Sequence, residues 1–328
     1  MPKKNLTVKE VAAKAGVSTA TISRVLNGDP KVRPATAEKV KKVIKQSGYR
    51  MNQTARSLKT RRTHTIGIVA PEFKNEFFMS IVTGIEDMLK NEGYSVVLCS
   101  SQESIDEEKD RLKLLKEKNV DGTIIIPGSS EGEHFNLMGE TPVVLVDRLV
   151  QGFSSDAVLS DNFQGSYEAV KSAASKGARR IGFLGGDMEL TSAKERYEGF
   201  NKACQDFSIQ ADEDLILFGN YHEDSGYKLM KQLMEHTSPP DYIFISNYFM
   251  HLGAARYLLE AGHDFPGLHI LSFDDLPLAS FFPCISIIVA QPMEEIGRKA
   301  AELLLGRIRG DMSEHKTIRL ETKMRMLE

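Results

Sequence analysis

Residues 7–28 read TVKEVAAKAGVSTATISRVLNG, and this stretch decides the fold of the first part of the chain. Thr7 and Glu10 are spaced as a capping box, in which two side chains satisfy free backbone groups at a helix start. Apolar residues follow at helical spacing as far as Gly16, a residue typical of helix ends. The pattern therefore predicts a first helix that begins after Thr7 and ends at Gly16.

Two further helices are expected directly afterwards. Ser18 is a favourable N-cap for a second helix over 19–26, and Asn27-Gly28 is a typical helix end. A third helix begins near Pro34, because proline suits the first helical position. Helix, short turn, helix is the plan of a helix-turn-helix, whose second helix can enter the major groove of DNA.

The second helix carries side chains suited to reading base edges. Arg24 can donate two hydrogen bonds to a guanine, and Thr19 and Ala20 are small enough to approach a base edge or a thymine methyl group. Further residues near the exposed start of the helix or close to phosphates complete the expected DNA surface, and they are Thr7, Ser18, Thr21, Ser23, Asn27 and Arg33. The alternative is a small basic helical bundle with a solvated charged face.

Charge separates the chain into two parts. The first 62 residues hold 16 lysines and arginines against three acidic residues, whereas the remaining 266 hold 26 against 42. A net charge of +13 followed by −16 indicates a head that binds a polyanion and a body that does not. We therefore expect a helix-turn-helix head over 1–50, a linker over 51–62 and a separate body over 63–328.

The body alternates short apolar runs with helical patterns, which is typical of parallel sheets with crossover helices. Strands are predicted at 66–70, 94–99, 123–126, 143–146, 180–184, 242–246 and 269–273, and 285–289 is a further apolar stretch. Helices are predicted at 77–91, 106–118, 164–176, 194–206, 225–236, 250–261 and 292–308. The length suits two parallel-sheet lobes. The first lobe is expected over about 63–162 and 292–328, and the second over about 163–291.

Polar side chains follow several predicted strands. Ligands of open α/β sheets bind beyond the carboxyl ends of the strands. The candidate ligand-binding residues are Ala70, Asp147, Arg148, Arg196, Asn247, Asp274 and Gln291. This set suits hydroxyls or a phosphate, and no nucleophile motif, phosphate loop or metal-ligand spacing accompanies it. We expect no catalytic residue, no metal and no cofactor.

Residues 12–27 resemble the DNA-reading signature of the LacI/GalR family of bacterial transcription regulators, A-x-x-A-G-V-S-x-x-T-[VI]-S-R-x-[LV]-N. The resemblance implies that Thr19, Ala20 and Arg24 read an operator. Residues 49–58 resemble the family's hinge motif Y-x-P-N-x-x-A-R-S-L, with methionine in place of the proline.

The hinge resemblance implies that two such segments of a dimer form helices in the minor groove. Leu58 would then wedge between base pairs and kink the duplex. Asn52, Ala55 and Arg56 of the same motif are the other expected DNA-binding residues. The alternative to hinge helices is a linker without fixed structure. Both descriptions hold if the segment becomes ordered only when it binds DNA.

The body resembles the periplasmic-binding-protein-like effector domain of the same family over essentially its full length. The sequences NEFF (75–78), AKERYEGF (193–200), SFDD (272–275) and QP (291–292) resemble the family's NPFF, ARERxxGF, GFDD and QP. The resemblance implies that Arg196, Asn247 and Asp274 contact an effector and that Phe77 or Phe78 packs on it. Glu76 and Tyr248 depart from the family pattern. The alternative for Phe77 and Phe78 is that they only fill the apolar core. The alternative for Asp147 is that it caps the following loop and does not contact a ligand.

These patterns predict a sequence-specific transcriptional regulator, and most directly a repressor of a carbohydrate-related operon. A small sugar or sugar phosphate between the lobes would control it. A homodimer on a pseudo-palindromic operator is expected. Tetrameric members of the family carry an additional heptad tail, whereas this sequence stops soon after its last predicted helix (292–308). One alternative is a regulator that responds to a non-sugar metabolite or a protein corepressor. Alternatives of a different class are a sugar-binding protein without a DNA role and a sugar-phosphate enzyme.

A cytoplasmic location without membrane association is expected. The N-terminal residues lack the apolar core of a signal peptide, and no apolar run is long enough to cross a bilayer. The three cysteines, Cys99, Cys204 and Cys284, are isolated in the sequence, which suits buried thiols in a reducing compartment.

Replacing Leu58 by alanine should weaken operator binding and leave effector binding intact, because the wedge contacts only DNA. Titration of the full-length variant with operator DNA and with effector measures the two affinities separately. Operator affinity equal to that of the unsubstituted protein would contradict the wedge role.

Overall fold

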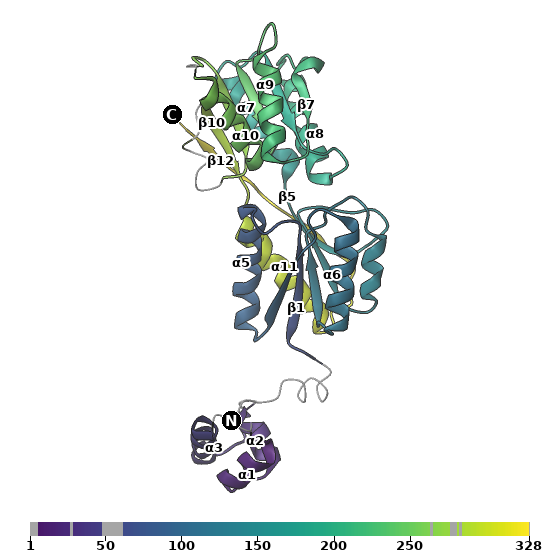
Figure 1. Cartoon of the computed structure of the whole chain (residues 1–328), viewed down its shortest axis with the longest axis vertical. Coiled ribbons are helices and arrows are strands. Elements are labelled where there is room, and N and C mark those ends of the chain that lie inside the picture. The colour runs from purple at the N-terminus through teal and green to yellow at the C-terminus, as the bar shows by residue number, and fades with distance from the viewer. Residues whose placement is uncertain are drawn as a thin grey trace. The chain divides into compact units, whose positions relative to one another are not determined.

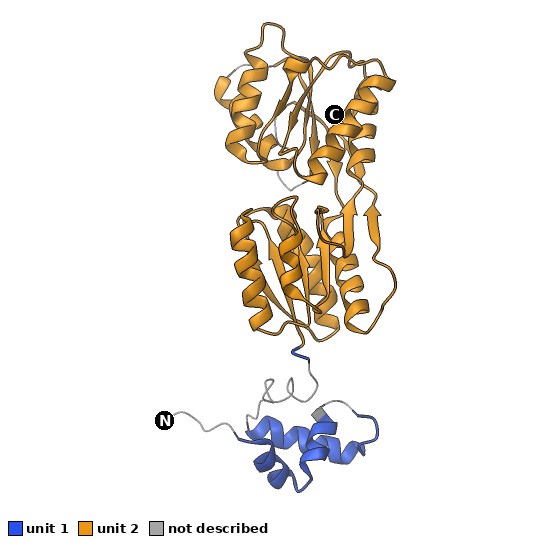
Figure 2. Cartoon of the chain, turned by 90° about the vertical axis from the view of Figure 1, so that its right-hand side faces the viewer, with its two compact units in different colours: residues 1–63 blue, residues 64–328 orange. Residues whose placement is uncertain are grey.

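The computed structural model describes residues 6–26, 29–47, 62–262, 265–275, 281 and 284–327. The chain divides into two compact units, Met1–Thr63 and His64–Glu328, which Figure 2 colours separately. Within the described ranges, no helix is long and apolar enough to cross a membrane. Each unit is built around its own apolar core.

The described part of the first unit consists of three helices (Figure 1), and they are α1 (Val8–Ala15), α2 (Thr19–Leu26) and α3 (Pro34–Ser47). All three begin where the sequence predicts. Thr7 Oγ1 accepts the Glu10 N–H at 3.3 Å, and Glu10 Oε2 accepts the Thr7 N–H at 2.6 Å, which completes the expected capping box. Gly16 ends α1 with a φ of 63°, in the left-handed region that favours glycine.

The core of the first unit is small and comes from all three helices. Its buried residues are Val11, Ala12, Ala15, Ile22, Val25 and Val40. Four lysines of α3 are exposed, and they are Lys39, Lys41, Lys42 and Lys45. This unit therefore holds an apolar interior and a basic exterior within about forty described residues.

The second unit contains two six-stranded sheets. The strands of the first sheet are β1 (Thr65–Ala70), β2 (Ser95–Ser100), β3 (Gly122–Ile125), β4 (Val143–Val146), β5 (Asp156–Ser160) and β11 (Thr317–Leu320), in the order β11-β5-β4-β3-β1-β2. Those of the second are β6 (Ile181–Gly185), β7 (Ile216–Phe218), β8 (Tyr242–Ile245), β9 (His269–Phe273), β10 (Ile285–Ala290) and β12 (Lys323–Met326), in the order β12-β10-β9-β8-β6-β7. All strand pairs are parallel except β10 with β12. The expected pair of parallel-sheet lobes is confirmed.

Seven α-helices and two short 3₁₀ helices connect these strands within the described part of the unit. The α-helices are α5 (Glu76–Asn91), α6 (Ile105–Glu117), α7 (Asn162–Ser175), α8 (Thr191–Asp206), α9 (Glu223–Met234), α10 (Tyr248–Ala261) and α11 (Met293–Ile308). The 3₁₀ helices are η1 (Glu133–Met138) and η2 (Glu213–Leu215). Every helix predicted for the body is present, with ends displaced by three residues or fewer.

Four strands were not predicted from the sequence, and they are β5, β7, β11 and β12. β7 has only three residues, and all four side chains of β12 are exposed, so neither shows a buried apolar run. Exposed and half-buried side chains alternate along β11. β7, β11 and β12 are edge strands, which form because an existing sheet offers backbone partners that a short sequence window does not reveal. β5 is a buried interior strand whose short apolar run was not assigned.

The chain crosses between the two lobes three times, at residues 160–162, 290–293 and 320–323. The third crossing takes β12 into the second sheet, where it pairs antiparallel with β10. The assignment of all of 292–328 to the first lobe is therefore wrong for β12. The sequence between β11 and β12 is polar and does not indicate that the strands join different sheets.

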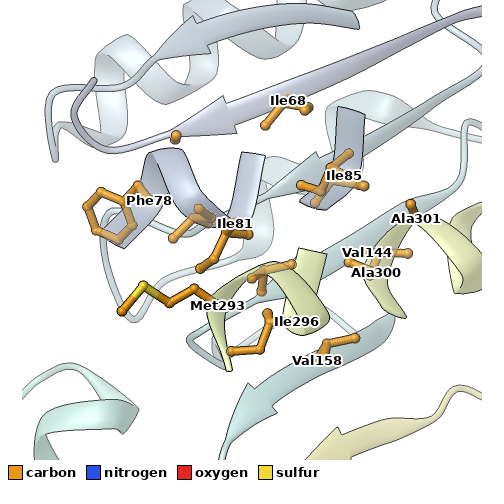
Figure 3. Packing of buried hydrophobic residues seen from close by; sticks show 14 of the residues in the cluster. Ile68, Phe78, Ile81, Ile85, Val144, Val158, Met293, Ile296, Ala300 and Ala301 are labelled. Carbon is orange, nitrogen blue, oxygen red and sulfur yellow. The ribbon is translucent and has the colours of Figure 1, made fainter. Parts of the chain in front are cut away.

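Helices α5 and α11 lie side by side on the first sheet. Figure 3 shows Ile81 and Ile85 of α5 close to Ile296 and Ala300 of α11, beside Val144 of β4. All five side chains are fully buried. This packing covers the first sheet with apolar surface from two distant parts of the sequence.

Glycines allow these two helices to approach closely. A Cβ atom at Gly84 would lie 2.1 Å from the carbonyl oxygen of Glu294, and a Cβ atom at Gly297 would lie 2.1 Å from that of Ile81. Both distances are far below van der Waals contact with backbone atoms that cannot rotate away. The crossing of α5 and α11 therefore requires glycine at both positions.

Replacing Gly297 by alanine should destabilise the protein by about 1–3 kcal/mol, because the added methyl group forces the helices apart. The matched control is Gly306→Ala in the same helix, where the nearest atom would be 3.9 Å away. That control should be neutral or stabilising by up to about 1 kcal/mol, since alanine favours helices. Urea unfolding of both variants measures the difference, and equal stabilities would contradict the packing argument.

Candidate functional site

The predicted base-reading side chains lie on the accessible side of α2. Thr19, Ala20 and Arg24 are exposed, whereas Thr21 and Ser23 are half-buried. The Ser18 hydroxyl accepts the Thr21 N–H at 3.1 Å and so caps α2 as expected. The second helix of a helix-turn-helix therefore presents its N-terminal residues outward, which is the arrangement that reaches bases.

Arg24 is an exposed charged group of this surface. Its side chain is 64% exposed, and its Nε atom lies 4.0 Å from Asp29 Oδ2. Arg33 is also exposed and stands at the start of α3, where its carbonyl oxygen accepts the N–H groups of Thr36 and Ala37. The side chain of Thr7 is held in the capping box, so its position is fixed by the helix start.

The remaining predicted DNA-binding residues lie outside the described residues. They are Asn27 at the end of α2 and Asn52, Ala55, Arg56 and Leu58 in the linker. Their roles stay predictions.

A polar cavity lies between the two lobes of the second unit. Eight of the nine predicted ligand-binding residues line it, and they are Phe77, Phe78, Asp147, Arg148, Arg196, Asn247, Asp274 and Gln291. Ala70 does not line it. Its methyl group is fully buried in the core of the first lobe, and its carbonyl oxygen accepts the Ser101 N–H.

Arg196 is the best-fixed cation of the cavity. Its Nε atom donates to Asn162 Oδ1 at 2.8 Å, and its Nη1 atom donates to the carbonyl oxygen of Ser246 at 2.6 Å. The guanidinium group lies 4.0 Å from the centroid of the Phe273 ring. Only 4% of the residue is exposed. Hydrogen bonds and stacking together offset the penalty of burying this charge.

Asp274 and Gln291 form a second polar cluster. Asp274 Oδ1 accepts the Gln291 side-chain amide at 2.5 Å, and Oδ2 accepts the Tyr248 N–H at 3.1 Å. The other amide atom of Gln291, Oε1, is buried and has no hydrogen-bond partner within the described chain. A buried acceptor of this kind is costly unless a ligand or a water completes it.

Asp147 and Arg148 bring a third cluster from the first lobe. Asp147 Oδ2 lies 3.3 Å from Arg148 Nε, and Arg148 Nη1 donates to the carbonyl oxygen of Pro127 at 2.8 Å. Asp147 Oδ1 is buried and lacks a partner among the described residues. Burial raises the pKa of Asp147, although Arg148 and Arg196 act in the opposite direction.

Asn247 has a structural role. Its Oδ1 atom caps α10 by accepting the Met250 N–H at 3.0 Å, and its Nδ2 atom donates to the carbonyl oxygen of Tyr221. Phe77 and Phe78 both belong to the core of the first lobe and also line the cavity. Their position is therefore compatible with a core role and with contact to a ligand.

Four lining residues have left-handed backbone conformations, although none is glycine. Glu103, Asp147, Tyr221 and Asp274 have φ values of 54°, 68°, 64° and 76°. Glu103 and Asp147 follow β2 and β4 of the first sheet, and Tyr221 and Asp274 follow β7 and β9 of the second. Such conformations are strained and tend to occur where a structure holds side chains for function.

Eight lining residues were not predicted, and they are Glu72, Asn75, Glu103, Ser192, Tyr221, His222, Tyr248 and Phe249. Glu103 follows β2 closely, so the strand-end rule would have found it if applied to that strand. Asn75 belongs to the NEFF motif (75–78), and Tyr248 follows Asn247 at a position that departs from the family pattern. Tyr221 and His222 lie in a loop without a sequence signal, and His222 Nε2 is 3.6 Å from Glu103 Oε2 of the first lobe. Among the described residues, no group of His, Cys, Asp and Glu is arranged to hold a metal ion.

Comparison with known proteins gives a match for each unit. A family model described as "Bacterial regulatory proteins, lacI family" matches residues 7–52. A second, described as "Periplasmic binding proteins and sugar binding domain of LacI family", matches residues 63–325.

Similar proteins match over nearly the whole chain. The HTH-type transcriptional repressor PurR of Vibrio atlanticus (strain LGP32) is 30% identical over 322 residues, which cover 97% of this chain and 96% of that protein. The HTH-type transcriptional regulator RegA of Clostridium saccharobutylicum is 36% identical over 305 residues, 91% of each chain. A solved structure described as a "transcriptional regulator CelR-cellobiose complex" is 31% identical, with a TM-score of 0.74, and covers 98% of this chain and 99% of that one.

A helix-turn-helix unit followed by a two-lobed unit with a polar cavity defines a DNA-binding transcriptional regulator with an effector-binding body. The chain belongs to the LacI family of bacterial regulatory proteins. It is a regulator and not an enzyme, as the sequence predicted.

Replacing Arg24 by lysine should weaken binding to the preferred operator by about 1–3 kcal/mol, since lysine keeps the charge but cannot form the bidentate contact with guanine. Nonspecific binding should change little. Selection of binding sites from random DNA measures the base preference. An unchanged consensus would contradict the reading role. As a control, Lys42→Gln removes an exposed charge of α3 and should weaken binding to all sequences alike.

Proposed function

We propose that this protein is a repressor that binds a pseudo-palindromic operator as a homodimer, and that a neutral sugar in the cavity between its lobes controls this binding. The unpaired acceptors of the cavity are the observation that carries the choice of ligand. Asp147 Oδ1 and Gln291 Oε1 are buried without partners in the described chain. They call for a ligand that donates hydrogen bonds, as sugar hydroxyls do.

The charges of the cavity also favour a neutral ligand over a sugar phosphate. Glu72, Glu103, Asp147 and Asp274 line it, against the two cations Arg148 and Arg196. Arg196 donates to Asn162 and to the carbonyl oxygen of Ser246. Arg148 Nη1 donates to the carbonyl oxygen of Pro127, while Arg148 Nε, 3.3 Å from Asp147 Oδ2, has no hydrogen-bond partner among the described residues. A phosphate only accepts hydrogen bonds at neutral pH and would meet an excess of carboxylates.

Aromatic side chains supply the apolar part of the cavity. Phe77 and Phe78 contribute from the first lobe, and Tyr248 and Phe249 from the second. Sugar rings have C–H faces as well as hydroxyl edges, so a cavity with both aromatic and hydrogen-bonding walls suits them.

The enclosed space is small and links ligand binding to movement. The cavity measures about 40 Å³, which is room for a few water molecules. A sugar therefore has to displace side chains or part the lobes as it enters. A ligand that binds two lobe arrangements unequally shifts the balance between them. This change of lobe angle would control how the two helix-turn-helix units of a dimer meet the half-sites of the operator.

Thermal-shift measurements on the full-length protein test the proposal. The ligands are glucose, galactose, ribose, maltose and cellobiose, together with glucose 6-phosphate and ribose 5-phosphate. At least one neutral sugar should raise the melting temperature and alter operator binding, because a ligand of the folded state stabilises it by mass action. A response to the phosphates alone would exclude the neutral-sugar proposal, and a response to none would exclude these ligands.

Replacing Gln291 by leucine should weaken binding of the active sugar about tenfold, since one buried hydrogen-bonding side chain is lost. The control Gln232→Leu lies on the exposed surface of α9 and should bind normally. Isothermal titration of both variants with that sugar measures the affinities. Equal affinities would contradict the assignment of Gln291.

A further inference from the structure

An ion pair between the two lobes stands behind the cavity arginine. Glu195 lies in α8 of the second lobe, and Arg319 lies in β11 of the first sheet. Arg319 Nη1 donates to Glu195 Oε2 at 2.8 Å, and Nη2 donates to Oε1 at 2.6 Å. Both oxygens of the carboxylate are used, which is the bidentate geometry of the stronger arginine pairs.

Asn162 connects this pair to the cavity. It stands at the start of α7, directly after the first crossing, and only 1% of the residue is exposed. Its Nδ2 atom donates to Glu195 Oε2 at 3.4 Å and to the carbonyl oxygen of Ser160 at 3.3 Å. Its Oδ1 atom accepts the Nε–H of Arg196 at 2.8 Å.

The donor and acceptor pattern of this network has only one consistent arrangement. Arg196 can only donate, so Asn162 must present its oxygen to Arg196. The amide NH₂ group then faces Glu195, which as a carboxylate can only accept. Glu195 thus fixes the orientation of the Asn162 amide, and Arg319 fixes the position of Glu195.

We infer that Glu195 and Arg319 are positioning residues for effector binding, which hold Arg196 in the cavity through Asn162. The inference rests on the proposed function, since it assigns a role in binding to residues that do not line the cavity. The network also touches two of the three crossings, at 160–162 and next to 320–323. A change of lobe angle would therefore alter the contacts of Arg196 directly.

The chain offers a closely matched control. Asp212 of the second lobe also joins an arginine and a side-chain amide, because it accepts from Arg180 Nε at 2.8 Å and from Gln210 Nε2 at 2.7 Å. The side chains of Arg180 and Asp212 are 21% and 28% exposed, and those of Arg319 and Glu195 are 39% and 19% exposed. Asp212 does not line the cavity.

The test compares Glu195→Gln with Asp212→Asn in the full-length protein. Glu195 accepts three N–H groups on two oxygens, two from Arg319 and one from Asn162. A glutamine has a single acceptor oxygen, and its NH₂ group would face a donor of Arg319 or Asn162, so it cannot accept all three. In the crystal structure of Glu195→Gln without ligand, the distance from Arg196 Nε to Asn162 Oδ1 should exceed about 3.5 Å, the limit of a hydrogen bond. In Asp212→Asn it should be unchanged. An Arg196 that keeps its place in Glu195→Gln overturns the inference.

Isothermal titration with each neutral sugar of the thermal-shift panel gives the second readout. Glu195→Gln should bind the active sugar about tenfold more weakly, within the range of coupling between neighbouring residues. Asp212→Asn should bind normally, although both variants lose similar thermal stability. Equal affinities overturn the positioning role. If no sugar binds the unsubstituted protein, the proposed function fails while the crystallographic comparison still decides the inference.

Two substitutions of Arg319 keep the test decisive if Glu195→Gln does not fold. Arg319→Met removes the ion pair from a partly exposed strand and should displace Arg196 in the same way. Arg319→Lys keeps the charge and should restore the position of Arg196 and most of the affinity. A lysine variant no better than the methionine variant in both readouts overturns the inference.

Discussion

The chain passes between its two lobes three times, and these crossings limit how the body can change shape. Three covalent connections prevent the lobes from separating, but they allow rotation about the connecting segments, as in other hinged proteins. The two walls of the cavity therefore stay connected, and a ligand between them can change the angle between the lobes. The first and third crossings adjoin Asn162 and Arg319, which share Glu195 as a hydrogen-bond partner. The hinge and the cavity are thus joined by side chains as well as by backbone.

The cavity holds several features that a purely stable fold would avoid. Buried acceptors at Asp147 and Gln291 lack partners in the described chain, and Glu103, Tyr221 and Asp274 occupy left-handed backbone conformations. Each feature costs about 1–3 kcal/mol when nothing compensates it. Dense apolar packing of each lobe, such as the contact between α5 and α11, allows the body to tolerate them. Of the nine non-glycine residues with positive φ in the described chain, four line this one cavity, together with both unpaired acceptors. Such departures from an unstrained fold are expected at a binding site.

The sequence predicted the elements well where a local pattern decides them. Caps such as Thr7 and Ser18 give the helix starts, and long apolar runs give the central strands. β12 was assigned to the wrong lobe because four exposed residues do not reveal which sheet they join. Ala70 was expected in the cavity because it ends a strand, but its side chain points into the core. The link from Arg319 to Arg196 joins residues more than 100 positions apart, so only the folded chain shows it.

The final strands of the two sheets, β11 and β12, come from neighbouring positions near the C-terminus. The first sheet cannot be completed until residue 320 has been synthesised, nor the second until residue 326. The helix-turn-helix unit is synthesised before the body and contains its own core. During translation, the basic head thus precedes a completed body by more than 250 residues. Both lobes then gain their last edge strand from a single short segment, which ties the maturation of one lobe to that of the other.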